Sequence, residues 1–518
     1  MLFVKFLLAM IPILWLIIAL SILKIAGHKA CLIALAITAV LSIAYWKLSV
    51  INTLTGALEG VLNALWPICL VIIAALFTYN LTLKTGAMDT IKKMLAGVST
   101  DKRILLLIIG WGFGNFMEGM AGFGTAVAIP ASMLVAVGLD PMGSVLACFC
   151  ANTTPTAFGS VGVPTTTLAT VTNLDVLPLS GDVATIQLIL TLLSPFIMVI
   201  IIGKGLKALK GMIPFTVVAS LSFVVPWFFA AHVIGCELPD IIGSIISLVI
   251  MVVAARILGP KGDTEYSIVM EEKEESSISA KEGIVAWSPF ILIFILLMIT
   301  SKLCPPIQNA IAGIKSNVIV YADKEVGATL GFSWINTPGV MIFIAAIIGG
   351  LIQKASFGDM ASVLGATLKT YWKTIVTICS VVAVAKVMGY SGMTKDIANF
   401  LVAVTGPIHI YPLISPLIGA IGAFVTGSGT STCVLFGPLQ ASTAAQLGLS
   451  PSWIAAANVM GAGIGKMISP QGIAIGAGAI SMVGKESEIL SAVFKYFILY
   501  VVIAGIVCFA GTMMGFGA

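Results

Sequence analysis

The sequence has 518 residues, of which 59% are apolar and only 9% are charged, and its net charge is +5. Soluble globular proteins carry about 25% charged residues, so this chain has too little charge to cover a soluble core of its size. The modest positive charge is spread over many segments, and no nucleic acid is expected as a partner. The composition instead predicts an all-α polytopic membrane protein embedded in a lipid bilayer.

Side chains suited to metal or covalent chemistry are scarce. The nine cysteines show no metal-ligand spacing, and only three histidines occur. Most of the cysteines lie inside apolar runs, where cysteine usually packs as a small hydrophobic residue. The sequence therefore predicts no metal site and no cofactor. A channel or an intramembrane enzyme is a remote alternative to a transporter, because neither a repeated selectivity filter nor a nucleophile–base pair stands out.

Apolar stretches long enough to form membrane-spanning helices, roughly 17–25 residues, recur along the whole chain. The first has no small-residue cleavage site, so we expect it to stay in place as a membrane helix. We predict about 12 crossings, at residues 3–23, 30–46, 61–83, 142–172, 183–203, 213–231, 240–258, 285–301, 337–353, 369–391, 452–480 and 488–513.

Four of the apolar regions do not read as simple spans. Residues 104–139 and 408–447 each contain two short apolar segments that meet at a tip rich in glycine and threonine, which predicts a re-entrant hairpin. Residues 142–172 and 452–480 are interrupted by glycine and proline, which predicts a broken helix. A membrane tolerates such broken backbone only where it is buried in protein or lines a wet cavity.

The basic residues predict the orientation of the chain. If the N-terminus lies outside, 19 of the 27 lysines and arginines fall on the inner side and six on the outer side, as the positive-inside rule requires. Twelve crossings then place both termini outside. We expect a first half at 1–258, a polar cytoplasmic linker at 259–283 and a second half at 284–518.

The two halves share a weak internal repeat. Five short anchors recur in the same order at offsets of about 305–310 residues, among them Gly124-Thr125 with Gly429-Thr430 and Ala151-Asn152 with Ala457-Asn458. An odd number of crossings between equivalent spans would turn the second copy upside down. This pattern predicts the two inverted repeats of a secondary transporter, whose broken helices surround a site at the membrane midplane.

Polar side chains at the tips and breaks are the candidate binding groups. Half-helix N-termini carry unpaired N–H groups and a partial positive charge, which suits a carboxylate. The alternative is that these small polar residues only allow close helix packing. The candidates that offer a hydroxyl or an amide are Thr125, Asn152, Thr153, Thr154, Thr430, Ser431, Asn458 and Gln471.

Three charged residues lie within apolar segments, where charge is expensive and usually functional. Lys466 is expected to pair with an anionic substrate, or alternatively to form a structural ion pair. Lys386 is a second anion-attracting candidate, unless it reaches the membrane surface. Glu118 is expected to carry a coupling proton, or alternatively to neutralise one of the lysines. Two lysines against one carboxylate leave a positive surplus, which favours an anion as substrate.

The longest motifs resemble the L-lactate permease family of bacterial lactate and glycolate transporters. They include GFGNFMEGMAGFGTAVAI at 112–129, ANTTPTAFGSVGVP at 151–164 and NVMGAGIGKMISPQGIAIG at 458–476. The resemblance implies proton symport of L-lactate, D-lactate or glycolate across the bacterial inner membrane, with Na⁺ coupling of a carboxylate carrier as the alternative. Resemblance to a wider ion-transporter superfamily implies an elevator-like homodimer.

The family motif also marks site residues by position. They are Glu118, Gly122, Gly124, Asn152, Asn458, Lys466, Ser469 and Gln471. The second tip departs from the family pattern, because it reads GSGT with Gly429 where an acidic residue is expected, and Cys433 stands where a polar amide is expected. This departure leaves the exact substrate and the coupling ion open.

Overall fold

The computed structural model describes residues 2–517, apart from 24, 123, 260–264, 268–277, 302, 328, 406–409 and 483–484. Within these ranges nine helical segments are long and apolar enough to cross a membrane, so the expected helical membrane protein is confirmed. Most of the proposed linker at 259–283, and His409 near the second hairpin, lie outside the described residues. The nine segments are built from α1 (Leu2–Ile17) with η1 (Ile18–Ile22), α2 (Gly27–Ala44), α3 (Val50–Asn63) with η2 (Ala64–Cys69) and α4 (Leu70–Lys84), α11 (Val176–Ile202), α12 (Ile213–Val233), α13 (Pro239–Leu258), α14 (Ala280–Thr300), α17 (Phe357–Ser391) and α23 (Glu486–Met513).

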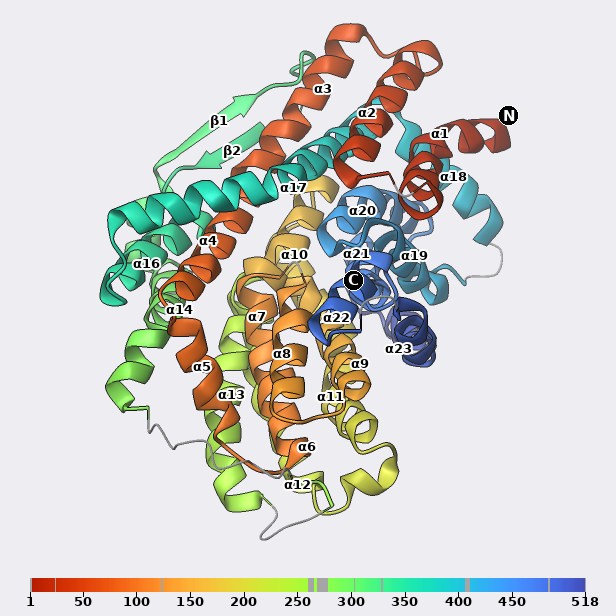
Figure 1. Cartoon of the computed structure of the whole chain (residues 1–518). Helices are drawn as coiled ribbons and strands as arrows, with labels where there is room; N and C mark the ends of the chain where they lie inside the picture. Colours follow the sequence, from red (N-terminus) through yellow and green to blue (C-terminus); the bar gives the residue numbers. More distant parts are fainter. Residues whose placement is uncertain are drawn as a thin grey trace.

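Shorter elements fill the space between these helices, and many of them lie near the centre of the molecule (Figure 1). Because several shorter helices are also apolar, the total of about 12 crossings and the inverted repeat stay predictions. The shorter elements are α5 (Ala87–Ala96), α6 (Lys102–Leu105), η3 (Leu106–Phe113), α7 (Gly114–Met120), α8 (Thr125–Ala136), α9 (Pro141–Asn152), η4 (Pro155–Phe158), α10 (Gly159–Thr172), η5 (Leu206–Leu209), α15 (Pro305–Ala312), β1 (Lys315–Ile319), β2 (Thr329–Ser333), α16 (Pro338–Ile352), α18 (Met393–Thr405), α19 (Tyr411–Thr426), α20 (Gly429–Gln446), α21 (Pro451–Lys466) and α22 (Pro470–Ala479).

Two features differ from what the sequence predicts: a small β-sheet is present, and one membrane span is longer than expected. Strands β1 and β2 pair antiparallel, with Lys315 opposite Ser333, and form a small sheet at one edge of the molecule (Figure 1). The span expected at 61–83 begins eleven residues earlier, at Val50 in α3, and bends at Trp66, whose φ of −132° and ψ of 116° are not helical. Trp66 precedes a proline, and the residue before proline is disfavoured in the α conformation.

Both predicted hairpins are present as pairs of helices joined by a glycine turn. In the first, α7 and α8 lie side by side (Figure 1), and the turn uses Gly122 at φ +60° and Gly124 at φ +86°. In the second, α19 and α20 are joined at Gly427, at φ +67°, followed by Ser428, whose hydroxyl accepts from the backbone N–H of Ser431. These left-handed conformations favour glycine, which explains the composition of both tips.

Both interrupted helices are also present. The first consists of α9, η4 and α10, and its backbone reverses hand at Ser160 (φ 47°), Val161 (φ 57°) and Gly162 (φ 76°). The second consists of α21 and α22, and it breaks at Met467–Ser469. The hydroxyl of Ser469 caps α22 by accepting from the N–H of Gly472 at 3.1 Å. Both breaks lie buried inside the protein, as irregular backbone within a membrane requires.

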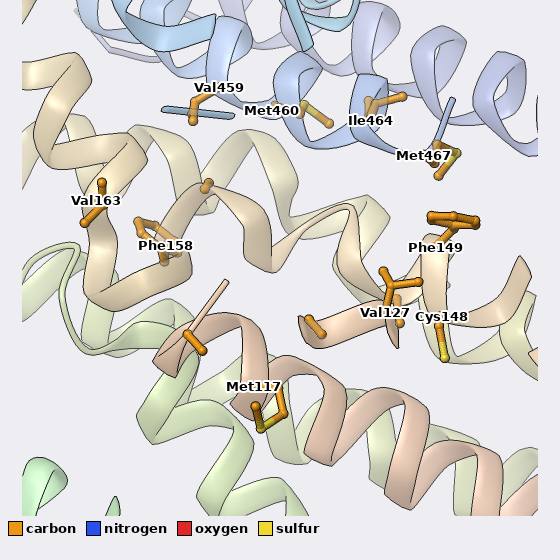
Figure 2. Packing of buried hydrophobic residues seen from close by; sticks show 14 of the residues in the cluster. Met117, Val127, Cys148, Phe149, Phe158, Val163, Val459, Met460, Ile464 and Met467 are labelled. Atoms are coloured by element: carbon orange, nitrogen blue, oxygen red, sulfur yellow. The ribbon is translucent and has the colours of Figure 1, made fainter. Parts of the chain in front are cut away.

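Helix α21 joins the two halves of the chain. On one side, its Val459, Met460, Ile464 and Met467 face apolar residues of α7 to α10, such as Phe158 (Figure 2). On the other side, α21 packs backbone to backbone against α19, because a Cβ on Gly461 would lie only 1.9 Å from the carbonyl oxygen of Pro416. The second broken helix is therefore held between the first half and the second hairpin.

This close packing predicts that Gly461→Ala destabilises the protein. The added methyl group has no space, and overpacking of this kind costs about 1–3 kcal/mol or more. The thermal unfolding midpoint of the purified protein in detergent should fall by several degrees. Gly389→Ala on α17 is the matched control, since nothing lies within 4 Å of its Cβ position. Equal midpoints for the two variants would contradict the close α19–α21 contact.

Candidate functional site

A cavity of about 410 Å³ lies where the two hairpin tips and the two helix breaks meet. The first half contributes Gly122 and Gly124 of the tip and four residues around the break, Asn152, Thr156, Gly159 and Ser160. The second half contributes residues 426–431 of its tip and Lys466 to Gly472 of its break. The start of α2 and the middle of α17 close the remaining side. Its volume is in the range of pockets that hold small molecules.

An ion pair between the two halves lies in the wall of this cavity. Nζ of Lys466 donates to Oε1 of Glu118 at 2.9 Å and to Oγ1 of Thr156 at 3.1 Å. Nδ2 of Asn152 donates to the second carboxylate oxygen of Glu118 at 2.8 Å. The Glu118 side chain is 3% exposed and that of Lys466 17% exposed. The ammonium group is therefore the more accessible partner of a pair that is neutral as a whole.

Local backbone structure places both members of the pair. Glu118 lies on α7 and fits against Gly159 at the first break, where a Cβ would come within 2.7 Å of Oε1. Lys466 is the last residue of α21, and the C-terminal end of a helix stabilises a positive charge. A carboxylate from one hairpin thus meets a lysine from the opposite broken helix.

The other polar groups on the cavity belong mainly to the second half. Thr430, Ser431, Ser469 and Gln471 line it, together with Gly124 of the first tip. Thr430 and Ser431 lie in the first turn of α20, and Ser469 and Gln471 lie at the start of α22. The first turns of two helices therefore line the same space, and the partial positive charge of a helix N-terminus suits an anion.

Four of the predicted binding residues do not line the cavity. The hydroxyl of Thr125 donates to the carbonyl of Gly122 at 2.7 Å, and that of Thr153 donates to the carbonyl of Phe149 at 3.0 Å. Thr154 is buried, and its hydroxyl has no hydrogen-bond partner among the described residues. Asn458 is fully buried and accepts from Gln440 at 3.2 Å. The hydroxyls of Thr125 and Thr153 are therefore hydrogen-bonded to nearby carbonyl groups of the backbone. The side chain of Asn458 connects α21 to α20.

Lys386 also lies away from the cavity, so its expected role there is not supported by its position. Its Nζ is 2.7 Å from Oε1 of Glu59, a carboxylate with 0% side-chain exposure, and the hydroxyl of Tyr390 donates to the other oxygen at 2.7 Å. The expected positive surplus is wrong, because Glu59 lies inside the longer α3–α4 span. Each of the two buried lysines has its own carboxylate.

The chain matches a known family of membrane proteins. The family model described as L-lactate permease matches residues 5–514. This chain belongs to the L-lactate permease family. Membership makes it a multi-pass membrane transporter rather than an enzyme.

Relatives within the L-lactate permease family cover almost the whole chain. An L-lactate permease of Streptococcus iniae is 45% identical over 449 residues, which are 87% of this chain and 93% of the relative. The L-lactate permease and the glycolate permease GlcA of Escherichia coli K12 are each 34% identical and cover 97% of this chain and 94% of their own. The solved structure of MtrF from Neisseria gonorrhoeae, described as an antimetabolite efflux pump, shares 14% identity at a TM-score of 0.50 over 94% of this chain and 95% of its own, and so has a similar fold.

Part of the cavity wall is formed by residues that the sequence did not indicate as site residues. His28 at the start of α2, and Lys373, Thr374 and Thr377 in the middle of α17, also line the cavity. The imidazole ring of His28 lies 5.5 Å from the ring of Trp372. The three-residue spacing of Thr374 and Thr377 places both on one face of α17 and was the available signal. Nothing in the sequence indicates that this face lies opposite the two breaks.

Proposed function

We propose that the protein takes up L-lactate and related small 2-hydroxymonocarboxylates, including D-lactate and glycolate, by proton symport across the bacterial cytoplasmic membrane. The names of the relatives, L-lactate permease and glycolate permease, support the substrate class. The observation that carries the proposal is the neutral Glu118–Lys466 pair at the cavity wall.

In this proposal the substrate carboxylate replaces Glu118 as the partner of Lys466. Lys466 is the more exposed member of the pair, so an anion in the cavity can reach its ammonium group. Thr430, Ser431 and Gln471 on the neighbouring wall offer hydrogen bonds to the second carboxylate oxygen and to the 2-hydroxyl group. A charged partner and hydroxyl-binding groups together suit a small hydroxy acid.

The charge balance of the site favours co-transport of one cation. Adding a monoanion to a neutral pair leaves one uncompensated negative charge in a buried site, and such a charge is expensive. A proton on Glu118 removes that charge at the place where it arises, because the substrate displaces this carboxylate from Lys466. One proton then accompanies each monocarboxylate, and the loaded site is neutral again.

Sodium coupling is the second candidate. Three oxygens at the second tip, Oγ1 of Thr426, Oγ1 of Thr432 and the carbonyl of Ser428, lie within 3.1 Å of one another. Hydroxyl and carbonyl oxygens are ligands that hard cations accept. A sodium ion at this tip would balance the substrate charge without a proton on Glu118.

The orientation and assembly of the protein are part of the proposal. The distribution of lysines and arginines supports a cytoplasmic linker and both termini outside. The hairpins and broken helices would move together as the transport unit, with α2 and α17 as a fixed wall of the cavity. The resemblance to the ion-transporter superfamily supports a homodimer built on that fixed part.

Uptake of labelled L-lactate by reconstituted vesicles tests the proposal. An inward proton gradient should drive accumulation, and an inward sodium gradient at equal pH should not. Accumulation that follows only the sodium gradient would replace the proton by sodium, and equal fluxes with and without either gradient would reduce the protein to a facilitator. Glycolate and D-lactate should compete with the labelled substrate, whereas an uncharged lactate amide should not.

A further inference from the structure

A second buried carboxylate, Asp240, lies close to the transport site and has no role in the mechanism above. It occupies the first turn of α13 and is 1% exposed. Its Oδ1 accepts from the indole N–H of Trp227 at 2.9 Å. Its Oδ2 is buried and has no hydrogen-bond partner in the part of the chain that the structure describes.

This environment suits a neutral carboxylic acid. An ionised carboxylate needs several donors or a cation to replace its water, and one indole N–H is far too little. A proton on Oδ2 removes the charge and leaves the bond from Trp227 intact. A protonated Asp240 would hold one proton inside the protein.

The position of Asp240 connects it to Glu118. Helices α7 and α13 pack so closely that a Cβ on Gly119, the neighbour of Glu118, would lie 2.7 Å from Cβ of Asp240. The ring of Trp227 packs edge to face on Phe158, at 5.5 Å between centroids, and Phe158 precedes the Gly159 that contacts Glu118. Asp240 itself does not line the large cavity, whereas Glu118 does.

A second cavity lies near the loop that precedes Asp240. It has a volume of about 180 Å³ and is lined by Glu237, three residues before Asp240, and by Val161 and Val163 at the first break. The loop at Cys236 touches that break, since a Cβ on Gly162 would lie 2.3 Å from the carbonyl oxygen of Cys236. Glu118 therefore lines the large cavity and Glu237 lines the smaller one, and Asp240 lies next to Glu118's neighbour Gly119 and three residues after Glu237 in the chain.

We propose that Asp240 holds the coupled proton while Glu118 is paired with Lys466, and passes it to Glu118 when the substrate takes that partner. The O–H bond of Asp240 breaks and an O–H bond of Glu118 forms, and the Asp240 carboxylate then takes a proton from a hydronium ion in the smaller cavity, next to Glu237, which leaves a water molecule. The charged or titratable groups on the elements next to Asp240 are Glu118 on α7, which is paired with Lys466, and Cys236 and Glu237 on the loop that leads into α13; on α12, Trp227 donates to Asp240. This inference rests on the proposed proton symport.

Asp240→Asn tests it, because the amide keeps the size of the side chain and an oxygen for Trp227. In reconstituted vesicles, exchange of internal unlabelled for external labelled L-lactate needs no net proton movement and should stay within about twofold of the unmodified protein. Accumulation driven by a proton gradient, and proton uptake followed with a trapped pH dye, should fall at least tenfold. Asp182→Asn is the matched control, since Asp182 is also hydrogen-bonded, to Ser452, but lies away from both cavities and should leave coupling unchanged.

The outcomes separate this inference from the proposed function. If the unmodified protein transports L-lactate without moving protons, proton symport and the role of Asp240 are both refuted. If the unmodified protein is coupled and Asp240→Asn is coupled equally well, only the role of Asp240 is refuted. Should Asp240→Asn not fold, infrared difference spectra decide: L-lactate should change a C=O band of a protonated carboxyl group, and Asp240→Glu should shift that band. A missing or unshifted band overturns the proposal.

Discussion

Replacing Lys466 with methionine should lower the affinity for L-lactate by at least about 100-fold, because the substrate carboxylate then loses its proposed cationic partner at the second helix break. Truncating one partner of a buried charge pair costs about 2–5 kcal/mol, and roughly 2.7 kcal/mol corresponds to a factor of 100. Methionine keeps most of the length of the lysine stem, so the helix break at Met467–Ser469 should persist. Equilibrium binding of labelled L-lactate to the purified variant measures the loss.

Lys386→Met is the matched control for Lys466→Met. Both lysines pair with a buried carboxylate, at 2.7 Å for Glu59 and 2.9 Å for Glu118. Both variants leave an unpaired buried carboxylate and should lose stability, by about 3–5 kcal/mol. Only the Lys466 variant should lose affinity, because Lys386 does not line the cavity. Equal affinities for the two variants would remove Lys466 from the binding site.

The hairpins and broken helices could be predicted from the sequence because their signals are local. Glycines that require left-handed backbone mark the tips, and Pro141, Pro451 and Pro470 stand at the first turn of helices α9, α21 and α22. The expected broken helices at 142–172 and 452–480 lie within one residue of the helix bounds that the structure gives. The start of the α3–α4 span could not be predicted, because Glu59 and Asn63 make its first half read as a polar surface.

Site residues could be predicted from the sequence only where closeness to a hairpin tip or a helix break places them at the cavity. Glu118, Asn152 and Lys466 lie next to a tip or a break, and the structure brings their side chains together. Thr153 also stands at a break and Asn458 lies in the middle of α21, yet neither residue lines the cavity, and their side chains bond to Phe149 and Gln440 instead. Rotation after an irregular turn depends on tertiary packing, and so does the approach of His28 and Lys373 from distant helices. A short stretch of sequence determines neither the rotation of a helix after a break nor which distant helix packs against it.

Glu118→Gln should separate substrate movement from proton movement. Glutamine keeps an oxygen that can accept from Asn152 and cannot be deprotonated, so it imitates the protonated carboxyl of the loaded site. Exchange of L-lactate across the vesicle membrane should continue, whereas accumulation driven by a proton gradient should fall to the level without a gradient. Because the titrating group is lost, the rate of exchange should no longer depend on external pH.

Two further measurements make the role of Glu118 specific. Glu118→Asp keeps an ionisable group on a shorter stem, so it should recover part of the coupled accumulation that Glu118→Gln loses. The double variant Glu118→Gln with Lys466→Met removes both charges at once and should be more stable than Lys466→Met alone, since no unpaired carboxylate stays buried. It should nevertheless fail to bind L-lactate. Unchanged concentrative uptake in Glu118→Gln would mean that Glu118 only neutralises Lys466, and the coupling ion would then have to bind elsewhere, with the oxygens around Thr426 and Thr432 as the next candidates.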